Sequence, residues 1–206
     1  MTYKINEIFL SLQGEGYWTG TPSVFVRFSG CNFWNGREKD KAESLCPFCD
    51  TDFVNGKDYN LEQLIREIKF YATKTTKHVV LTGGEPTLQM DQELCFKLKE
   101  MGYYVAVETN GSNLIDHQWV DWITFSPKSA ERTRLKHAHE IKVLWPTPFG
   151  CPPQEFYSIH WRGRADHCFV QPIDNEESNI AGAVRYCLAT YGWRLSLQAH
   201  KILGMR

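Results

Sequence analysis

Short runs of β-branched and aromatic residues recur along the chain, and glycine or polar residues follow each run directly. The runs predict strands at 23–29, 78–82, 103–108, 122–125, 140–144, 168–171 and 194–197. Apolar residues at helical spacing predict helices at 61–72, 91–101 and 179–191, the first capped by Asn60. Strands that alternate with helices are typical of a parallel sheet. The sequence therefore predicts an α/β fold.

The helices are too few for a complete eight-fold barrel. Residues 128–140 and 145–167 resemble loops and are rich in Pro, His and Arg. The polar residues at the strand ends are typical of a barrel whose loops converge on one face. We therefore expect an incomplete (β/α) barrel of about six parallel strands with a reduced set of helices. At 206 residues, one domain spanning 1–206 is expected.

Charge and hydropathy exclude several classes of function. The formal net charge is −1, which gives no electrostatic reason to expect nucleic acid or an anionic membrane as a partner. The N-terminal residues lack the pattern of a secretory leader, and no apolar run is long enough to span a membrane. We expect a cytoplasmic protein.

Three of the seven cysteines lie close together in the sequence. Cys46 and Cys49 form a CPFC pair, and Cys31 precedes them across an insert of fourteen residues, 32–45. Three thiolates suit an iron–sulfur cubane with one iron open to another ligand, whereas a structural zinc site needs four protein ligands. A CxxC pair alone is more often a zinc or redox motif. The other four cysteines are expected to be inert: Cys95, Cys151, Cys168 and Cys187.

Further motifs accompany the cysteines. GGEP follows the strand at 78–82, and Phe48 lies inside the CxxC pair. The chain thus resembles the radical S-adenosylmethionine enzymes, whose usual signature is CxxxCxxC. The longer first gap resembles that of some members of the 7-carboxy-7-deazaguanine synthase family. The motifs that carry this resemblance, in order, are SLQGEG (11–16), PSVFVRFSGCN (22–32), CDTDF (49–53), LTGGEPTLQ (81–89), ETNGS (108–112), SPK (126–128), QPID (171–174) and QAHKILG (198–204).

The resemblance implies a reaction and a set of cofactors. The reaction is ring contraction of 6-carboxy-5,6,7,8-tetrahydropterin to 7-carboxy-7-deazaguanine with loss of ammonia, in queuosine biosynthesis. The cofactors are a [4Fe–4S] cluster held by Cys31, Cys46 and Cys49, S-adenosylmethionine, and Mg²⁺ with Thr51 as its protein ligand. An electron donor such as flavodoxin or ferredoxin and a homodimer are also implied.

The resemblance also implies two sets of binding residues. Gly83 and Gly84 are expected to let the backbone approach the methionine end of S-adenosylmethionine, and Glu85 to accept from its ammonium group or to order the turn. Lys128 is expected at a carboxylate or ribose hydroxyl, and Phe48, Gln171 and Asp174 near the nucleoside. The full set expected to bind it is Phe48, Cys49, Asp50, Gly83, Gly84, Glu85, Ser126, Pro127, Lys128, Gln171, Pro172, Ile173 and Asp174. The set expected for the pterin is Leu12, Gln13, Gly14, Glu15, Arg27, Thr82, His200 and Arg206.

Chemistry gives several of these residues a role. Gln13 and Glu15 match the N–H and NH₂ donors of the pterin edge, and Arg27 can form a fork to its carboxylate. Structural alternatives stay open for four of these residues. They are a structural ion pair for Arg27, a turn-forming role for Glu15 and Gln13, and a turn hydroxyl for Thr51. Two other functions also stay open: a glycyl-radical activating enzyme, against which the long gap counts, and a non-catalytic zinc-binding module.

Overall fold

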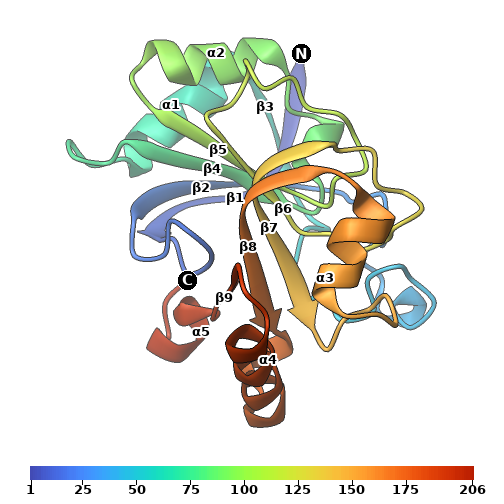
Figure 1. Ribbon diagram of the computed structural model, residues 1–206. Coiled ribbons are helices and arrows are strands. Elements are labelled where there is room, and N and C mark those ends of the chain that lie inside the picture. The colour runs from blue at the N-terminus through green and yellow to red at the C-terminus, as the bar shows by residue number, and fades with distance from the viewer. The chain divides into compact units, whose positions relative to one another are not determined.

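The structure is a computed structural model that describes residues 1–206 and contains two compact units. Unit 1 comprises residues 1–11, 21–109 and 115–123, and unit 2 comprises residues 12–20, 110–114 and 124–206. Figure 1 labels their helices and strands in chain order. None of the helices is long and apolar enough to cross a membrane.

Unit 1 is built on a sheet with strand order β3-β1-β2-β4-β5. The strands are β1 (Thr2–Leu12, whose last residue belongs to unit 2), β2 (Pro22–Phe28), β3 (Lys57–Asn60), β4 (His78–Gly83) and β5 (Tyr104–Thr109). β4 pairs in parallel with β2 and β5, and β3 pairs antiparallel with β1. β4 is buried along nearly its whole length, which suits the apolar run Val79 to Leu81 at its centre.

The helices of unit 1 begin at side-chain caps. Asn60 Oδ1 accepts a hydrogen bond from the Gln63 N–H at 2.9 Å and closes a capping box at the start of α1 (Leu61–Tyr71), as the sequence predicts. The Asp91 side chain caps α2 (Gln92–Glu100) by accepting a hydrogen bond from the Leu94 N–H at 2.9 Å. Short 3₁₀ turns occupy Glu38–Asp40 (η1), inside the insert, and Pro86–Leu88 (η2), after the GGE turn.

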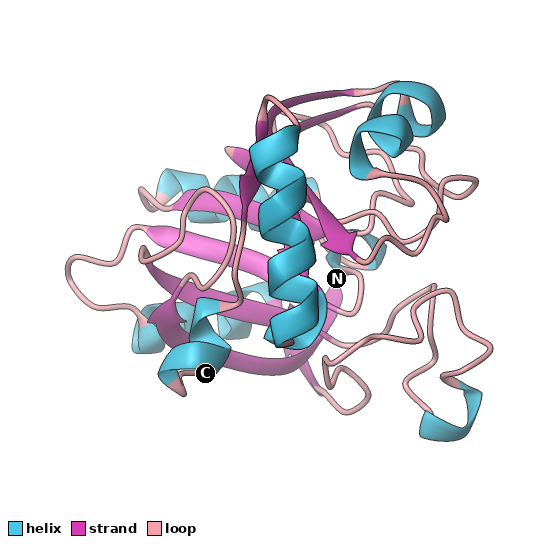
Figure 2. Cartoon of the chain, turned by 60° about the horizontal axis from the view of Figure 1, so that its bottom comes forward, coloured by secondary structure: helices cyan, strands magenta, loops and turns pink.

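Unit 2 contains parallel strands β7 (His137–Trp145), β8 (Arg164–Pro172) and β9 (Trp193–Leu195). The last two residues of β6 (Trp122–Phe125) pair in parallel with β7. The helical segments are α3 (Pro153–Glu155), the π-helix η3 (Phe156–Trp161), the 3₁₀ turn η4 (Ile173–Asn175), α4 (Glu177–Ala189) and α5 (Ala199–Leu203). α4, the long helix in the centre of Figure 2, packs against β7, β8 and β9.

The structure corrects the expected loop at 145–167. This segment contains α3, η3 and the start of β8, because its aromatic residues pack into the core of unit 2. Phe156 and Trp161 are fully buried, and Trp161 Nε1 donates to the Leu135 carbonyl at 2.6 Å. β1, β3 and α5 were also missed. The alternate burial of Tyr3 and Ile5 in β1 is the period-two signal that marks such a strand.

Candidate active site

The cysteine loop belongs to unit 1. Cys31 comes three residues after the end of β2, and a turn closed by the Cys49 N–H on the Cys46 carbonyl (3.1 Å) joins the other two cysteines. The Ser44 hydroxyl accepts from the Cys46 N–H at 3.2 Å, and the Phe33 carbonyl accepts from the Leu45 N–H at 3.3 Å. The insert therefore folds back so that the CxxC turn is held by residues near Cys31.

The three thiols suit a thiolate-ligated cluster. No cysteine of the chain forms a disulfide, and Cys31 and Cys49 are partly exposed while Cys46 is buried. Burial raises the pKa of Cys31, and the negative charges of Glu85 and Cys49 raise it further. A positively charged iron centre would remove this repulsion between neighbouring anions. The residues present thus fit the predicted cubane with three cysteine ligands.

The two glycines after β4 let its end meet the backbone that leads to Cys31. A Cβ atom on Gly83, whose φ is +136°, would lie 2.3 Å from the Phe28 carbonyl oxygen, and one on Gly84 would lie 2.1 Å from the Gly30 oxygen. The Gly84 N–H donates to the Phe28 carbonyl at 3.1 Å and the Glu85 N–H to the Gly30 carbonyl at 2.9 Å. These contacts join the GGE turn to the entrance of the cysteine loop.

Glu85 is fully buried and orders its own turn. Its Oε1 atom accepts from the Thr87 N–H (3.1 Å), the Thr87 hydroxyl (2.5 Å) and the Thr109 hydroxyl (2.7 Å). Because Thr109 ends β5, this carboxylate ties the ends of β4 and β5 together. The sequence allowed Glu85 either to order the turn or to accept from an ammonium group, and the structure shows the first arrangement.

Arg27 and Thr82 are neighbours across the β2–β4 pair. Arg27 Nε forms an ion pair with Glu7 Oε1 of β1 at 2.8 Å, and the Thr82 hydroxyl donates to Glu108 Oε2 of β5 at 3.1 Å. Two carboxylates, one guanidinium and one hydroxyl thus lie on adjacent strands. About one fifth of the Arg27 side chain is exposed (20%), so the ion pair with Glu7 does not bury this residue completely.

Unit 2 holds the other expected substrate residues, and Glu15 is the most constrained of them. Lys142 Nζ forms an ion pair with Glu15 Oε2 at 2.5 Å, and Gln198 Nε2 donates to Oε1 at 3.1 Å. The Lys142 side chain is only 5% exposed. Burial acts to raise the pKa of Glu15, but the charge and hydrogen bond of Lys142 and the charge of His200 lower it to about 2. Glu15 is therefore a carboxylate at neutral pH.

The loop around Glu15 is fixed by β7 and by the segment after β9. Glu140 lies two residues before Lys142, on the same face of β7. It accepts hydrogen bonds from the Tyr17 N–H and the Thr124 hydroxyl, each at 2.7 Å. The Ser196 hydroxyl accepts from the Gly16 N–H at 2.9 Å. Gln13 closes the loop by accepting from the Gly20 N–H through its carbonyl and from the Glu15 N–H through Oε1.

Gly14 lies against His200. The Ala199 N–H donates to the Gly14 carbonyl at 2.9 Å, and a Cβ atom at position 14 would lie 2.4 Å from His200 Nδ1. The structure thus brings together Gln13, Gly14, Glu15 and His200 within unit 2. Leu12 precedes this group at the end of β1, and Arg206 is an exposed residue beyond α5.

The remaining residues expected to bind S-adenosylmethionine make local contacts. In unit 2, Lys128 Nζ donates to the Ser126 hydroxyl at 2.7 Å, and Gln171 Oε1 accepts from the Ser196 hydroxyl at 3.0 Å. Asp174, in a left-handed conformation (φ 54°) after Pro172 and Ile173, pairs with Lys201 at 2.8 Å. In unit 1, the Thr51 hydroxyl lies 3.5 Å from Asp50 Oδ1, beside Phe48 and Cys49.

Comparisons with known proteins decide the family. Residues 41–145 match the model of the Radical SAM superfamily. A 7-carboxy-7-deazaguanine synthase of Bradyrhizobium diazoefficiens is 42% identical over the full length of both chains, and one of Bacteroides thetaiotaomicron is 40% identical, also over the full length of both. The chain belongs to the 7-carboxy-7-deazaguanine synthase family. Membership of this radical SAM family implies a [4Fe–4S] cluster and S-adenosylmethionine.

A solved 7-carboxy-7-deazaguanine synthase structure extends the comparison to the fold. The crystal structure of QueE from Escherichia coli matches 97% of this chain and 95% of its own, with a TM-score of 0.71 and 27% identity. The predicted fold class, α/β with mostly parallel strands and few helices, is confirmed. The resemblance identified from the sequence motifs is confirmed as well.

Four residues that hold the expected substrate residues, or the loops that carry them, were not predicted from the sequence. Glu140 and Lys142 are charged residues inside the strand run EIKVL, and such residues on a buried strand require partners. That pattern is the signal that could have identified them. Glu7 and Gln198 carry no comparable local signal, because their roles depend on which strands become neighbours.

Proposed function

We propose that this protein converts 6-carboxy-5,6,7,8-tetrahydropterin to 7-carboxy-7-deazaguanine with loss of ammonia. The observation that carries the proposal is end-to-end similarity, at 40–42% identity, to proteins named 7-carboxy-7-deazaguanine synthase. The two alternatives, a glycyl-radical activating enzyme and a non-catalytic zinc-binding module, do not explain this similarity.

Cys31, Cys46 and Cys49 would hold the [4Fe–4S] cluster. When bound, the reduced cluster and S-adenosylmethionine supply the 5′-deoxyadenosyl radical that this superfamily uses. The protein's task is to fix the loop that carries the thiols. The Glu85 turn does this, since it hydrogen-bonds to Gly30 next to Cys31 and is itself tied to β5 through Thr109.

We assign substrate recognition to two charged groups of opposite sign. Glu15, held ionised by Lys142, accepts hydrogen bonds from the N–H and NH₂ donors of the aminopyrimidinone. Arg27 donates its remaining guanidinium N–H groups to the substrate carboxylate while Glu7 fixes its Nε. Smaller substrate contacts are proposed for Leu12, Gln13, Gly14, Thr82, His200 and Arg206.

For S-adenosylmethionine, the proposed contacts follow side-chain chemistry. Lys128, oriented by Ser126 and Pro127, would meet a carboxylate or ribose hydroxyl, and Gln171, oriented by Ser196, would hydrogen-bond the nucleoside. The proposed set is completed by Phe48, Cys49 and Asp50 of the CxxC segment, by Gly83, Gly84 and Glu85, and by the segment Pro172 to Asp174.

A magnesium ion is proposed with Thr51 as its protein ligand. Mg²⁺ often keeps several waters and takes few protein ligands, so one hydroxyl beside the Asp50 carboxylate is an adequate protein contribution when substrate oxygens are added.

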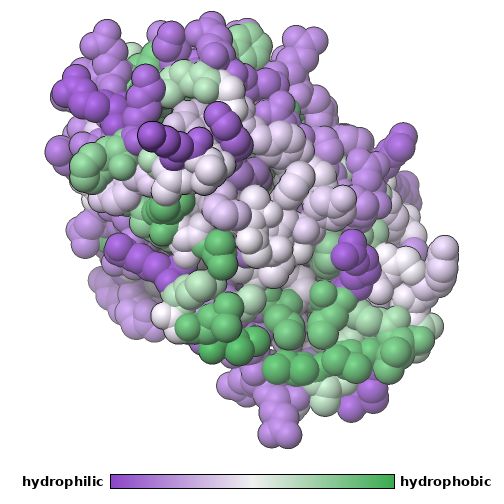
Figure 3. Space-filling view, turned by 90° about the vertical axis from the view of Figure 1, so that its left-hand side faces the viewer, coloured by the Kyte–Doolittle hydropathy of each residue, from purple (hydrophilic) through white to green (hydrophobic).

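We further propose a cytoplasmic homodimer that receives electrons from a flavodoxin or ferredoxin. A reducing compartment is needed to keep the three cluster cysteines as thiols. Support for self-association comes from apolar side chains exposed on α4 and α5, namely Leu188, Ile202 and Leu203. Figure 3 shows apolar residues gathered along the lower part of the face that it draws.

The proposal is tested by anaerobic reconstitution, reduction and incubation with S-adenosylmethionine, Mg²⁺ and 6-carboxytetrahydropterin. The expected result is about four iron and four sulfide per chain and a product with the mass of 7-carboxy-7-deazaguanine. Cys49→Ser should lose both cluster and product, whereas Cys187→Ser, on α4, should keep both. A colourless protein with one zinc, or an intact cluster without product, would contradict the proposal.

A further inference from the structure

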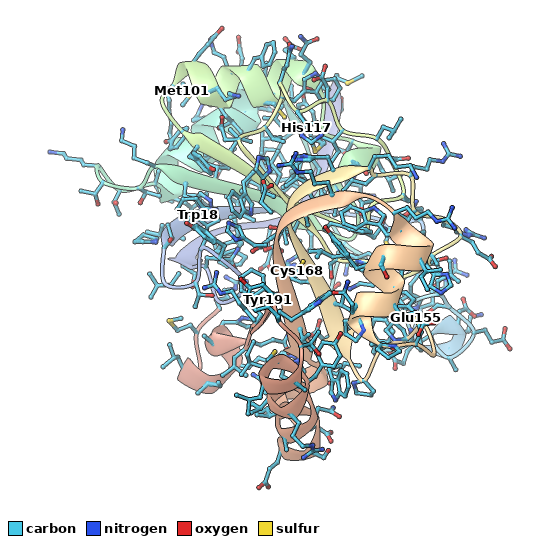
Figure 4. All side chains as sticks on the ribbon, viewed as in Figure 1. Trp18, Met101, His117, Glu155, Cys168 and Tyr191 are labelled. Atoms are coloured by element: carbon cyan, nitrogen blue, oxygen red, sulfur yellow. The ribbon has the colours of Figure 1, made fainter.

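Three side chains of unit 2 that the proposed reaction does not use are grouped as metal ligands would be. Cys151, Glu155 and His160 each offer one ligand atom, and these three atoms all lie within 4.8 Å of one another. They belong to residues 151–160, a segment that contains α3 and all but the last residue of η3. Figure 4 labels Glu155 at this short helix.

The unusual helix geometry of this segment brings Glu155 and His160 together. Residues five apart lie about 140° apart around an α-helix of 3.6 residues per turn. In a π-helix, whose hydrogen bonds join residues i and i+5, such residues lie nearly above each other. Glu155 immediately precedes the π-helix Phe156–Trp161, and His160 is five residues further on. π-helical turns are rare and are found often at functional sites.

Cys151 is held at the start of the same segment. The Thr147 hydroxyl donates to the Cys151 carbonyl at 2.6 Å, and the two prolines that follow restrict the backbone before α3. Phe149 stacks on the buried Phe156 with ring centroids 4.1 Å apart. The loop that carries the thiol is therefore fixed against the helix that carries the carboxylate and the imidazole.

We propose that Cys151, Glu155 and His160 bind one Zn²⁺ ion. Thiolate, imidazole and carboxylate are the three ligand types that zinc takes in proteins, and the two anions balance its charge. Typical zinc–ligand bonds place neighbouring ligand atoms about 3.3–3.8 Å apart. Glu155 and His160 are exposed and can close the difference by side-chain rotation. Three protein ligands leave the fourth position to water, and the ion would fasten the 147–151 loop to the helix.

The probe is ZnCl₂, one equivalent, added anaerobically to protein with its iron–sulfur cluster in place. After desalting, metal analysis should find about one zinc per chain with the iron content unchanged, and X-ray absorption at the zinc edge should show one sulfur neighbour at about 2.3 Å. Three sulfur neighbours would place the zinc at the cysteines of residues 31–49, and no retained zinc would mean that no site exists. Either result overturns the proposal.

Single substitutions test which side chains bind the zinc ion. Cys151→Ala and His160→Ala should each weaken zinc binding at least tenfold in competition with a chromophoric chelator. Cys187→Ala and His117→Ala, matched in residue type and outside the segment, should bind as the unaltered protein does. Equal zinc affinity in all four variants would overturn the assignment. Iron content reports folding of each variant, so a zinc result does not depend on the proposed reaction.

Discussion

Lys142 is the residue on which the charge of Glu15 depends. Burial alone would raise the pKa of Glu15, and the neighbouring ammonium holds it at about 2 instead. A carboxyl group whose pKa is lower in the folded than in the unfolded chain stabilises the folded protein at pH values above the unfolded pKa, which is near 4.5 for Glu15. This stabilisation is lost as the pH falls toward 2. At neutral pH, therefore, the ion pair contributes in full.

Lys142→Met should leave a buried carboxylate without its cation. We expect the free energy of unfolding at pH 7 to fall by about 3–5 kcal/mol. The pKa of Glu15 should rise above 4.5, so kcat/KM should acquire an acid limb that falls tenfold per pH unit below the new pKa. Measuring kcat/KM from pH 5 to 8 checks this. Glu15→Gln is the matched control, because it lowers activity without adding an acid limb.

Arg27 poses the choice between a structural and a binding role, since it both pairs with Glu7 and remains partly exposed. Arg27→Ala should raise KM for the pterin about 10- to 150-fold, as expected for loss of a hydrogen bond to a charged group, with the cluster absorbance unchanged. Glu7→Gln, which keeps the guanidinium, should have a much smaller effect. A bleached cluster in Arg27→Ala would make its role structural.

Among the elements, the turn after β4 is hydrogen-bonded to the backbone that leads into the cysteine loop. The sequence identified the two glycines as ligand contacts, which stays a prediction, but not their structural role. They were expected to let backbone approach a ligand, and the structure shows that they let β4 approach the backbone of Phe28 to Gly30. Such a contact depends on the pairing of β2 with β4, which no local pattern specifies.

Gly84→Ala should therefore disturb the cluster. Its Cβ would lie 2.1 Å from the Gly30 oxygen and 3.0 Å from the Cys31 Cβ, so Cys31 must move. Overpacking of this kind costs about 1–3 kcal/mol, and we expect iron content to fall with it. The control is Gly102→Ala, which has a left-handed φ (+79°) but no atom within 4 Å. It should lose about 1 kcal/mol of stability and keep its iron. Equal iron content in both variants would contradict this account of Gly84.

Elements with a strong local sequence signal were predicted, and elements that depend on tertiary packing were missed. α1, α2 and the strands around β4 have strong local signals: helical periodicity, the Asn60 cap and unbroken β-branched runs. The π-helix at 156–161 was missed because its core residue Trp161 depends on Phe125 of β6, against which it packs, and on the Leu135 carbonyl, to which it donates. Local propensity does not report such tertiary packing.

At the scale of the whole molecule, the family and the reaction class could be predicted because ordered motifs such as GGEP and CPFC identify them without any knowledge of packing. The partners of the site residues could not be predicted, because they are distant in sequence from the residues they contact. Glu7 pairs with Arg27, and Lys142 and Gln198 contact Glu15. One domain over residues 1–206 stays a prediction.

We propose above that this chain acts on a carboxylated pterin through a cluster held by three cysteines. The most direct measurement is product formation by reduced, reconstituted protein with 6-carboxytetrahydropterin, run beside tetrahydropterin that lacks the carboxylate. We expect several turnovers per cluster to 7-carboxy-7-deazaguanine with the first compound and none with the second. An intact four-iron cluster with no deazaguanine product from the carboxylated pterin would contradict it.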